Sequence, residues 1–242
     1  MATKTRTGMK VITGDKNNLY IQTGLQAAHN VKEVDFKNFE ITLQANVSAE
    51  IKRGSVVKID GTDSRLDDFW VIEKVAANTA KIKLADTKQR EDWADLKPVD
   101  LVGDTQTLTG ATLRVVKFAL VKTAAEVTLP GSNRDTIDVT TILDKSPQTI
   151  PGPIKYEDAS IVFFESRRTE EQVAVRKAFR SAEQLVFMVI VDKEFADYFV
   201  GAILGSEGKQ IAAGGAEATK ANYKITVNNA DIELDLLATA GS

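Results

Sequence analysis

The order of apolar and polar positions along the chain predicts a mainly β fold. Short runs rich in Val, Ile, Thr and aromatic residues are separated by turn residues such as Gly61 and Asn78. The runs that we expect to be strands are 10–14, 18–24, 40–45, 54–60, 68–75, 79–85, 112–123, 135–143, 159–166, 185–192 and 197–204. After them, the sequence predicts a Gly-rich loop over 205–220 and a hairpin over 222–237 that turns at Asn228-Asn229.

One segment, near 169–184, has helical periodicity. Thr169 and Gln172 have the spacing of a capping box, and two acidic residues follow Thr169, where the helix dipole favours them. The positions that we expect to pack on a sheet are Val175, Ala178, Phe179 and Ala182. Strands, one helix and again strands follow each other in this order, which excludes a βαβ series with a parallel sheet.

The sequence pattern between residues 25 and 110 differs from that of the rest of the chain. Here the expected strands are short and carry frequent charges, and small turns connect them. We interpret this region as a small β-barrel or meander.

Composition narrows the classes of protein that fit. The chain has 242 residues, no cysteine and a formal net charge of −3. Disulfides, thiolate nucleophiles and cysteine zinc sites are therefore excluded, and the charge argues against a protein that clamps nucleic acid by neutralising phosphates. No run approaches the roughly 18 apolar residues of a membrane span, and the first residues lack the apolar stretch of a secretory signal. We expect the mature protein to begin near Met1, in a cytoplasm.

Candidate chemistry is sparse. His29 is the single histidine, so neither a histidine metal site nor a Ser-His-Asp triad has partners, and we expect a solvent-facing side chain. Asp67-Asp68 and Glu91-Asp92 lack the spacing of an EF-hand and are interpreted as solvated surface. The residues around Gly208-Lys209 do not fit a phosphate-binding loop. The sequence predicts no catalytic residue, no metal site and no cofactor, and hence a protein that is not an enzyme.

Three adjacent stretches resemble the major tail tube proteins of long-tailed phages of the lambda type, the siphoviruses. They are "VTLPGSNRDTIDVTTILDKSPQTIPGPIKYEDASIVFFES", the helix "TEEQVAVRKAFRSAEQ" and "LVFMVIVD". In that family a Thr/Asp-rich strand leads through a long loop to a second strand, one helix with Ala-Phe near its end, and a strand pair. The matching pieces here are 136–141, the loop 144–157, 159–166, Ala178-Phe179 and 185–204.

The resemblance implies a β-sandwich with a flanking helix that closes into hexameric rings. The rings stack into a hollow tail tube through which DNA leaves the virion, without a membrane and without specific DNA binding. The implied partners are other copies of the chain and the tape-measure, tail terminator and baseplate proteins. The implied locations are the virion tail and, during assembly, the host cytoplasm. Residues 25–110 have no counterpart in the family, so we expect a tail-tube domain of 1–24 and 111–242 with 25–110 as an inserted small β-barrel.

Two candidate sites follow from the resemblance. Three of the five prolines lie in the loop 144–157, and fixed φ angles would lower the entropy lost when such a loop orders against a neighbouring ring. The residues that we expect at an inter-ring contact are Pro147, Ile150, Pro151, Gly152 and Pro153. A rigid turn within one subunit is the alternative. The residues that we expect to line the lumen are Thr136, Asp138, Thr140, Asp231, Glu233 and Asp235, with outward solvation as the alternative.

Two other functions stay open at this point. The tube of a contractile secretion system shares the expected fold. A carbohydrate- or surface-binding module within 25–110 is the second, with Trp70 and Trp93 as a stacking platform, although burial of these indoles within the small barrel competes with that role.

Overall fold

The computed structural model describes residues 18–46, 50–62, 66–76, 80–85, 97, 101–139, 146, 148–165, 168–191, 195–210, 219–227 and 232–235. Within these ranges the protein is mainly antiparallel β, as the sequence predicts. The strands are β1 Asn18–Asp35, β2 Glu40–Leu43, β3 Val56–Asp60, β4 Phe69–Val75, β5 Lys81–Leu84, β6 Thr105–Thr107, β7 Thr112–Leu120, β8 Ala124–Thr128, β9 Ser132–Asp138, β10 Thr149–Tyr156, β11 Ala159–Phe164, β12 Gln184–Val191, β13 Phe195–Gln210, β14 Lys220–Val227 and β15 Ile232–Asp235. The helix α1 spans Glu170–Ser181.

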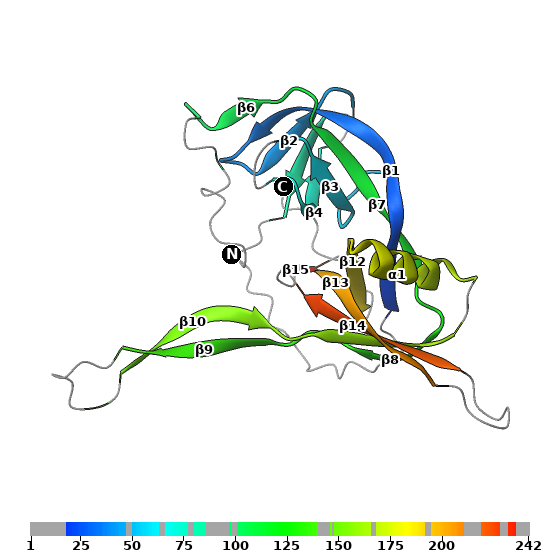
Figure 1. Cartoon of the computed structure of the whole chain (residues 1–242). Coiled ribbons are helices and arrows are strands. Elements are labelled where there is room, and N and C mark those ends of the chain that lie inside the picture. Colours follow the sequence, from blue (N-terminus) through cyan, green and yellow to red (C-terminus); the bar gives the residue numbers. More distant parts are fainter. Residues whose placement is uncertain are drawn as a thin grey trace, which may run out of the picture.

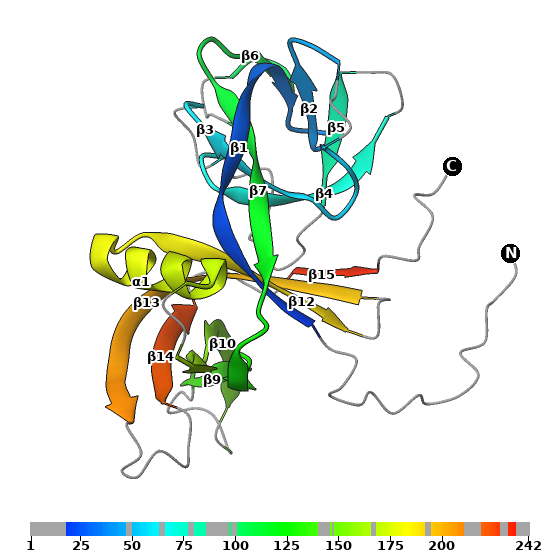
Figure 2. The same cartoon turned by 90° about the vertical axis from the view of Figure 1, so that its right-hand side faces the viewer.

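Most strands belong to one sheet with the order β2-β5-β4-β3-β7-β1-β12-β13-β14-β11-β8. One half of this sheet closes into a barrel, because β2 pairs with β1 as well as with β5. Figure 1 shows this barrel above and the remaining strands below, with α1 beside the lower strands. β1 and β7 run through both halves, and Figure 2 shows them side by side between the barrel and the lower sheet.

Three apolar clusters form the core. The barrel cluster contains Trp70 and Ile59, both fully buried. The lower cluster packs α1 against the sheet and includes Phe187 and Phe199, whose rings stack at 4.9 Å. A third cluster holds barrel residues such as Val56 and lower-sheet residues such as Tyr198 in one apolar group. The barrel and the lower sheet therefore share apolar packing as well as two strands.

A hydrogen bond between the two halves accompanies the third cluster. The Tyr198 hydroxyl donates to the backbone oxygen of Gly54, just before β3, at 2.8 Å. Burial raises the pKa of Tyr198, and the neighbouring Asp197 adds to that shift. The phenol is held neutral and donating, which suits a contact inside the molecule.

The helix forms where expected, but its cap and its buried face differ from the prediction. Thr169 is the N-cap residue by position, yet its side chain makes no capping hydrogen bond. The capping box is wrong because the Gln172 amide turns inward and donates to Thr123 Oγ1 and to the Phe164 oxygen, each at 2.8 Å. The buried residues of the helix are Glu171, Gln172, Ala174, Val175 and Ala178, whereas Phe179 and Ala182 are exposed.

The strands after the helix also differ from the prediction. β13 continues through Gln210, so the expected loop does not begin at residue 205. The predicted hairpin over 222–237 is wrong, because β14 and β15 both pair with β13, β14 along 201–210 and β15 along 195–198. They follow each other along one side of β13 instead of facing each other. The strand expected at 10–14 lies outside the described residues.

Candidate functional site

The feature that stands apart from the rest of the fold is a hairpin of β9 and β10, which we call the arm. The two strands form a separate sheet with a register from Asp138 opposite Thr149 to Ser132 opposite Tyr156. Figure 1 shows the arm extending away from the lower sheet, on the side opposite α1. It continues the edge hairpin of β8 and β11, and a hydrogen bond of 2.9 Å from the Glu157 nitrogen to the Gly131 oxygen joins the two.

Within the expected loop 144–157, residues 149–156 form the strand β10. Ile150 and Pro151 lie within β10, and a register shift between Pro151 and Ile154 indicates a bulge. Gly152 fits this bulge because an added Cβ would lie 3.0 Å from the backbone oxygen of Asp135. Proline is tolerated here because β10 has a second edge with no strand partner in the described residues, so the missing N–H breaks no ladder there. Pro147 lies outside the described residues.

The arm exposes apolar side chains. Ile137 and Ile150, which face each other in the register, are 45% and 48% exposed, and Val139 is 40% exposed. Lys155 and Asp135 form an ion pair across the two strands. An isolated two-stranded hairpin is marginally stable in water, and exposed apolar side chains gathered in one place mark sites that contact another protein. The arm is the candidate functional site, and the chemistry that it offers is association.

The sheet also presents backbone edges. β8 pairs with β11 on one side, and four of its five residues are exposed. β7 pairs with β3 only from Thr112 to Val115, so residues 116–120 bond to β1 alone. Within the described ranges, no strand covers the second side of β8 or of this part of β7. Uncovered N–H and C=O groups of this kind are available to a strand of another molecule.

Four of the six predicted lumen positions lie within the described residues, on two different strands. Thr136 and Asp138 lie exposed on β9 in the arm. Glu233 and Asp235 lie on β15, opposite Asp197 and Phe195 of β13. Thr140 and Asp231 lie outside the described residues.

A buried polar cluster at the start of α1 was not predicted. Thr123, in the connection from β7 to β8, donates to Glu171 Oε1 at 3.2 Å and accepts the hydrogen bond from Gln172. Glu171 and Gln172 are only 5% and 2% exposed. The cluster fixes the chain just before the β8 edge. No sequence signal reveals it, because Thr123 is 48 and 49 residues distant from its partners.

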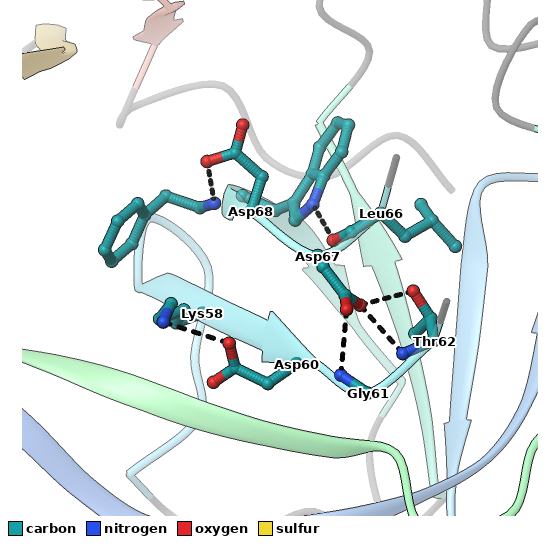
Figure 3. A network of polar contacts seen from close by, with 9 residues as sticks. Lys58, Asp60, Gly61, Thr62, Leu66, Asp67 and Asp68 are labelled. Atoms are coloured by element: carbon teal, nitrogen blue, oxygen red, sulfur yellow. Dashed lines mark hydrogen bonds and ion pairs between the residues drawn. The ribbon is translucent and has the colours of Figure 1, made fainter. Parts of the chain in front are cut away.

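The β3–β4 turn of the barrel holds a second polar network (Figure 3). Asp67 accepts hydrogen bonds from the backbone nitrogens of Gly61 and Thr62, at 3.0 and 2.8 Å, and from the Thr62 hydroxyl. Asp67 is exposed, as expected, but it also closes this turn. The Trp70 indole nitrogen donates to the Leu66 oxygen at 2.9 Å, and Trp70 is 0% exposed. Trp70 is therefore a core residue and not a stacking platform; Trp93 and Glu91-Asp92 lie outside the described residues.

We expect Asp67→Asn to weaken the barrel and to flatten the acid part of the stability curve. Burial opposes ionisation of Asp67, but the hydrogen bonds from Thr62 and Gly61 outweigh it and lower the pKa from 3.8. A lowered pKa stabilises the fold above the unfolded-state value and is lost as the pH falls through the folded-state value. The expected loss at neutral pH is about 1 kcal/mol, discounted for the exposure of Asp67.

Urea unfolding at a series of pH values from about 7 down to about 2 measures this effect. Asp60→Asn, which removes the same charge from the exposed pair with Lys58, is the matched control. If both variants lose stability equally and keep the wild-type slope, the Asp67 hydrogen bonds do not stabilise the turn.

The described ranges of the chain contain neither a metal-ligand cluster nor a membrane-spanning helix. In those ranges no three His, Cys, Asp or Glu side chains are grouped so that they could hold a metal ion. No described helix is long and apolar enough to span a membrane. His29 lies half-buried on β1, so the expected solvent-facing side chain is only partly correct.

Comparison with known proteins gives no match to a family model and none to a curated protein. Among solved structures, the chain is similar to one in the virion of a native gene transfer agent particle, with 18% identity and a TM-score of 0.38, over 48% of this chain and 88% of that one. It is also similar to the SPP1 tail tube, with 16% identity and a TM-score of 0.36, over 49% of this chain and 69% of that one. Because these identities and TM-scores are low, neither likeness carries an argument about function.

Proposed function

We propose that this chain is a structural virion protein that builds the tube of a siphovirus-type phage tail. The observation that carries the proposal is the arm, a hairpin with exposed Ile137 and Ile150 and no sheet behind it within the described residues. Full burial of an exposed isoleucine side chain contributes about 1.5–3 kcal/mol to a contact. Each of these two side chains is already about half buried, so each would contribute about half of that. Burial of both isoleucines would therefore stabilise the binding of a partner surface to the arm.

The two sheet edges without a strand partner in the described residues are the evidence that favours assembly into a ring. β8 and residues 116–120 of β7 are different surfaces of one molecule, and a contact between different surfaces of identical subunits is heterologous. Heterologous contacts generate closed rings when the rotation closes, and edge-to-edge pairing satisfies the backbone groups that an open sheet exposes. Hexameric closure follows the family that the sequence resembles.

The proposal includes the partners that the resemblance to tail tube proteins implies. Copies of the chain associate with each other, and tape-measure, tail terminator and baseplate proteins meet the tube at its inside and its ends. DNA passes through the lumen without specific binding, which agrees with the net charge of −3. Assembly takes place in the host cytoplasm and the product resides in the virion tail, without catalysis.

Negative-stain electron microscopy of the purified chain at rising concentration tests the proposed function. Rings with sixfold averages, or hollow rods, are the expected result. Uniform small particles at every concentration, also after addition of preformed tube ends, would contradict it.

The lumen assignment stays a prediction for Thr136, Asp138, Thr140, Asp231, Glu233 and Asp235. If Asp231, Glu233 and Asp235 line the lumen, reversing them to Lys will slow DNA delivery, because phosphates will then bind the wall. Infection kinetics of phage that carry the reversed residues provide the measurement, and tube length in micrographs is the control for assembly. Unchanged delivery through tubes of normal length would place these residues elsewhere.

A further inference from the structure

The two outer edges of the arm differ in their backbone hydrogen-bonding groups. The Val139 nitrogen donates to the Gln148 oxygen at 2.9 Å, and directly opposite residues of an antiparallel pair alternate between hydrogen-bonded and non-hydrogen-bonded pairs. Counted from that bond along the register, Thr136 and Pro151 form a non-hydrogen-bonded pair. The backbone groups of these two residues are therefore directed away from each other, toward the outer edges of β9 and β10.

The outer edge of β10 is interrupted. Proline has no N–H, so Pro151 leaves this edge without a donor at the position opposite Thr136. The bulge between Pro151 and Ile154 places an extra residue in β10 and disturbs the spacing of the remaining groups. Prolines and bulges are features that keep an edge strand from pairing with another chain. The β10 edge is therefore unsuited to bind a further strand.

The outer edge of β9 is uninterrupted. At the other end of the arm, the Glu157 nitrogen donates to the Gly131 oxygen at 2.9 Å. The same alternation therefore directs the backbone groups of Ser132 and Arg134 outward. Together with Thr136 they form a row of N–H and C=O groups at every second residue, and β9 contains no proline. No strand covers this side of β9 within the described ranges.

We propose that the outer edge of β9 is a strand-addition site for an extended strand, outside the arm, of another copy of this chain. This inference rests on the proposed function and names the surface by which the arm binds its partner. A row of alternating backbone donors and acceptors pairs with an extended chain, whose own N–H and C=O groups have the same spacing. A two-stranded hairpin is marginally stable in water, so a third strand would also stabilise the arm.

A strand from outside the arm fits this edge better than a second arm does. The β10 edge of a second arm lacks the donor at Pro151, and pairing of two β9 edges would give an isologous contact that closes as a dimer and cannot lengthen a tube. Two other strands have an unused side in the described residues, because β6 pairs only with β1 and β15 only with β13. A copy of the chain therefore offers strands that can pair with β9 and continue head-to-tail growth.

Proline substitution tests the β9 edge. Thr136→Pro removes an outward N–H of β9 and no hydrogen bond between β9 and β10, because Thr136 belongs to a non-hydrogen-bonded pair. The matched control Thr149→Pro makes the same change at the outer edge of β10. In electron micrographs, Thr149→Pro should form tubes at the wild-type concentration, and Thr136→Pro should need a concentration about tenfold higher, as expected for the loss of one hydrogen bond. Equal tube formation by all three chains, or an equal loss in both variants, overturns the proposal.

Hydrogen exchange gives a measurement that needs no substitution. In the free wild-type chain the amides of Arg134 and Thr136 should exchange quickly, and assembly should slow them by about tenfold or more. The Thr149 amide should exchange at the same rate in both states. Unchanged exchange at Arg134 and Thr136, or slower exchange only at Thr149, overturns the proposal. A soluble dimer with slower exchange at β9 would identify a second arm as the occupant and also overturn it.

The outcomes for this inference and for the proposed function are distinct. Tubes in micrographs with unchanged exchange at β9 would overturn only the strand-addition site. Slower exchange at β9 in larger assemblies that are neither rings nor tubes would retain the site and overturn the tube. A chain that stays monomeric at every concentration, without and with preformed tube ends, would overturn both.

Discussion

Removal of the arm should leave a folded chain that cannot lengthen into tubes. The variant joins Ser132 to Tyr156 through an Asn-Gly turn and deletes 133–155. These two residues face each other in the register, so a two-residue turn spans them. Tyr156 is kept because it packs against the lower apolar cluster, while no residue of the deleted segment belongs to the three core clusters in the described ranges.

The measurements are thermal unfolding and electron microscopy. We expect the melting temperature to change little and hollow rods to disappear, with rings retained if the sheet edges close them. The matched variant Ile137→Lys, Ile150→Lys keeps the arm and replaces only its exposed apolar groups, and it should shorten tubes nearly as severely. Normal tubes from the deleted chain would show that the arm is not the stacking contact.

The barrel strands were predictable because each one repeats a local pattern. The runs 54–60 and 68–75 alternate or concentrate apolar residues between turn residues, and both form strands close to the expected bounds. The position of α1 was equally local, since its acidic start and apolar spacing lie within one segment. A pattern within about ten to fifteen neighbouring residues predicts an element correctly when the tertiary contacts favour the same element.

The predictions that were wrong failed because of contacts between distant parts of the chain. Gln172 had an expected local partner, but a buried amide needs hydrogen bonds, and Thr123 with the Phe164 oxygen supplies them from other parts of the fold. Pro151 was expected in a loop, and it is acceptable in a strand because one edge of β10 has no strand partner in the described residues. Residues 149–156 were expected in a loop and form a strand instead, because proline spacing indicates a stiff backbone but does not reveal strand pairing.

Replacement of Trp70 by Ala should cause the largest loss of stability among single changes in the barrel. The indole is 0% exposed, lies in the barrel cluster and donates to the Leu66 oxygen, so Ala leaves a cavity and removes this hydrogen bond. Truncations of this kind cost about 3–5 kcal/mol, a large share of the roughly 5–15 kcal/mol that stabilises a domain. The third cluster should transmit part of this loss to the lower sheet.

Urea unfolding followed by far-UV circular dichroism measures the loss as a lower midpoint. Phe179→Ala is the matched control, because that ring is 42% exposed on α1 and its removal should cost about 1 kcal/mol or less. A sugar-binding platform would behave in the opposite way, with lost affinity and little lost stability. Trp70→Ala at wild-type stability would therefore return the barrel to the class of binding modules, whereas the expected lower midpoint makes the indole a structural residue of the barrel core.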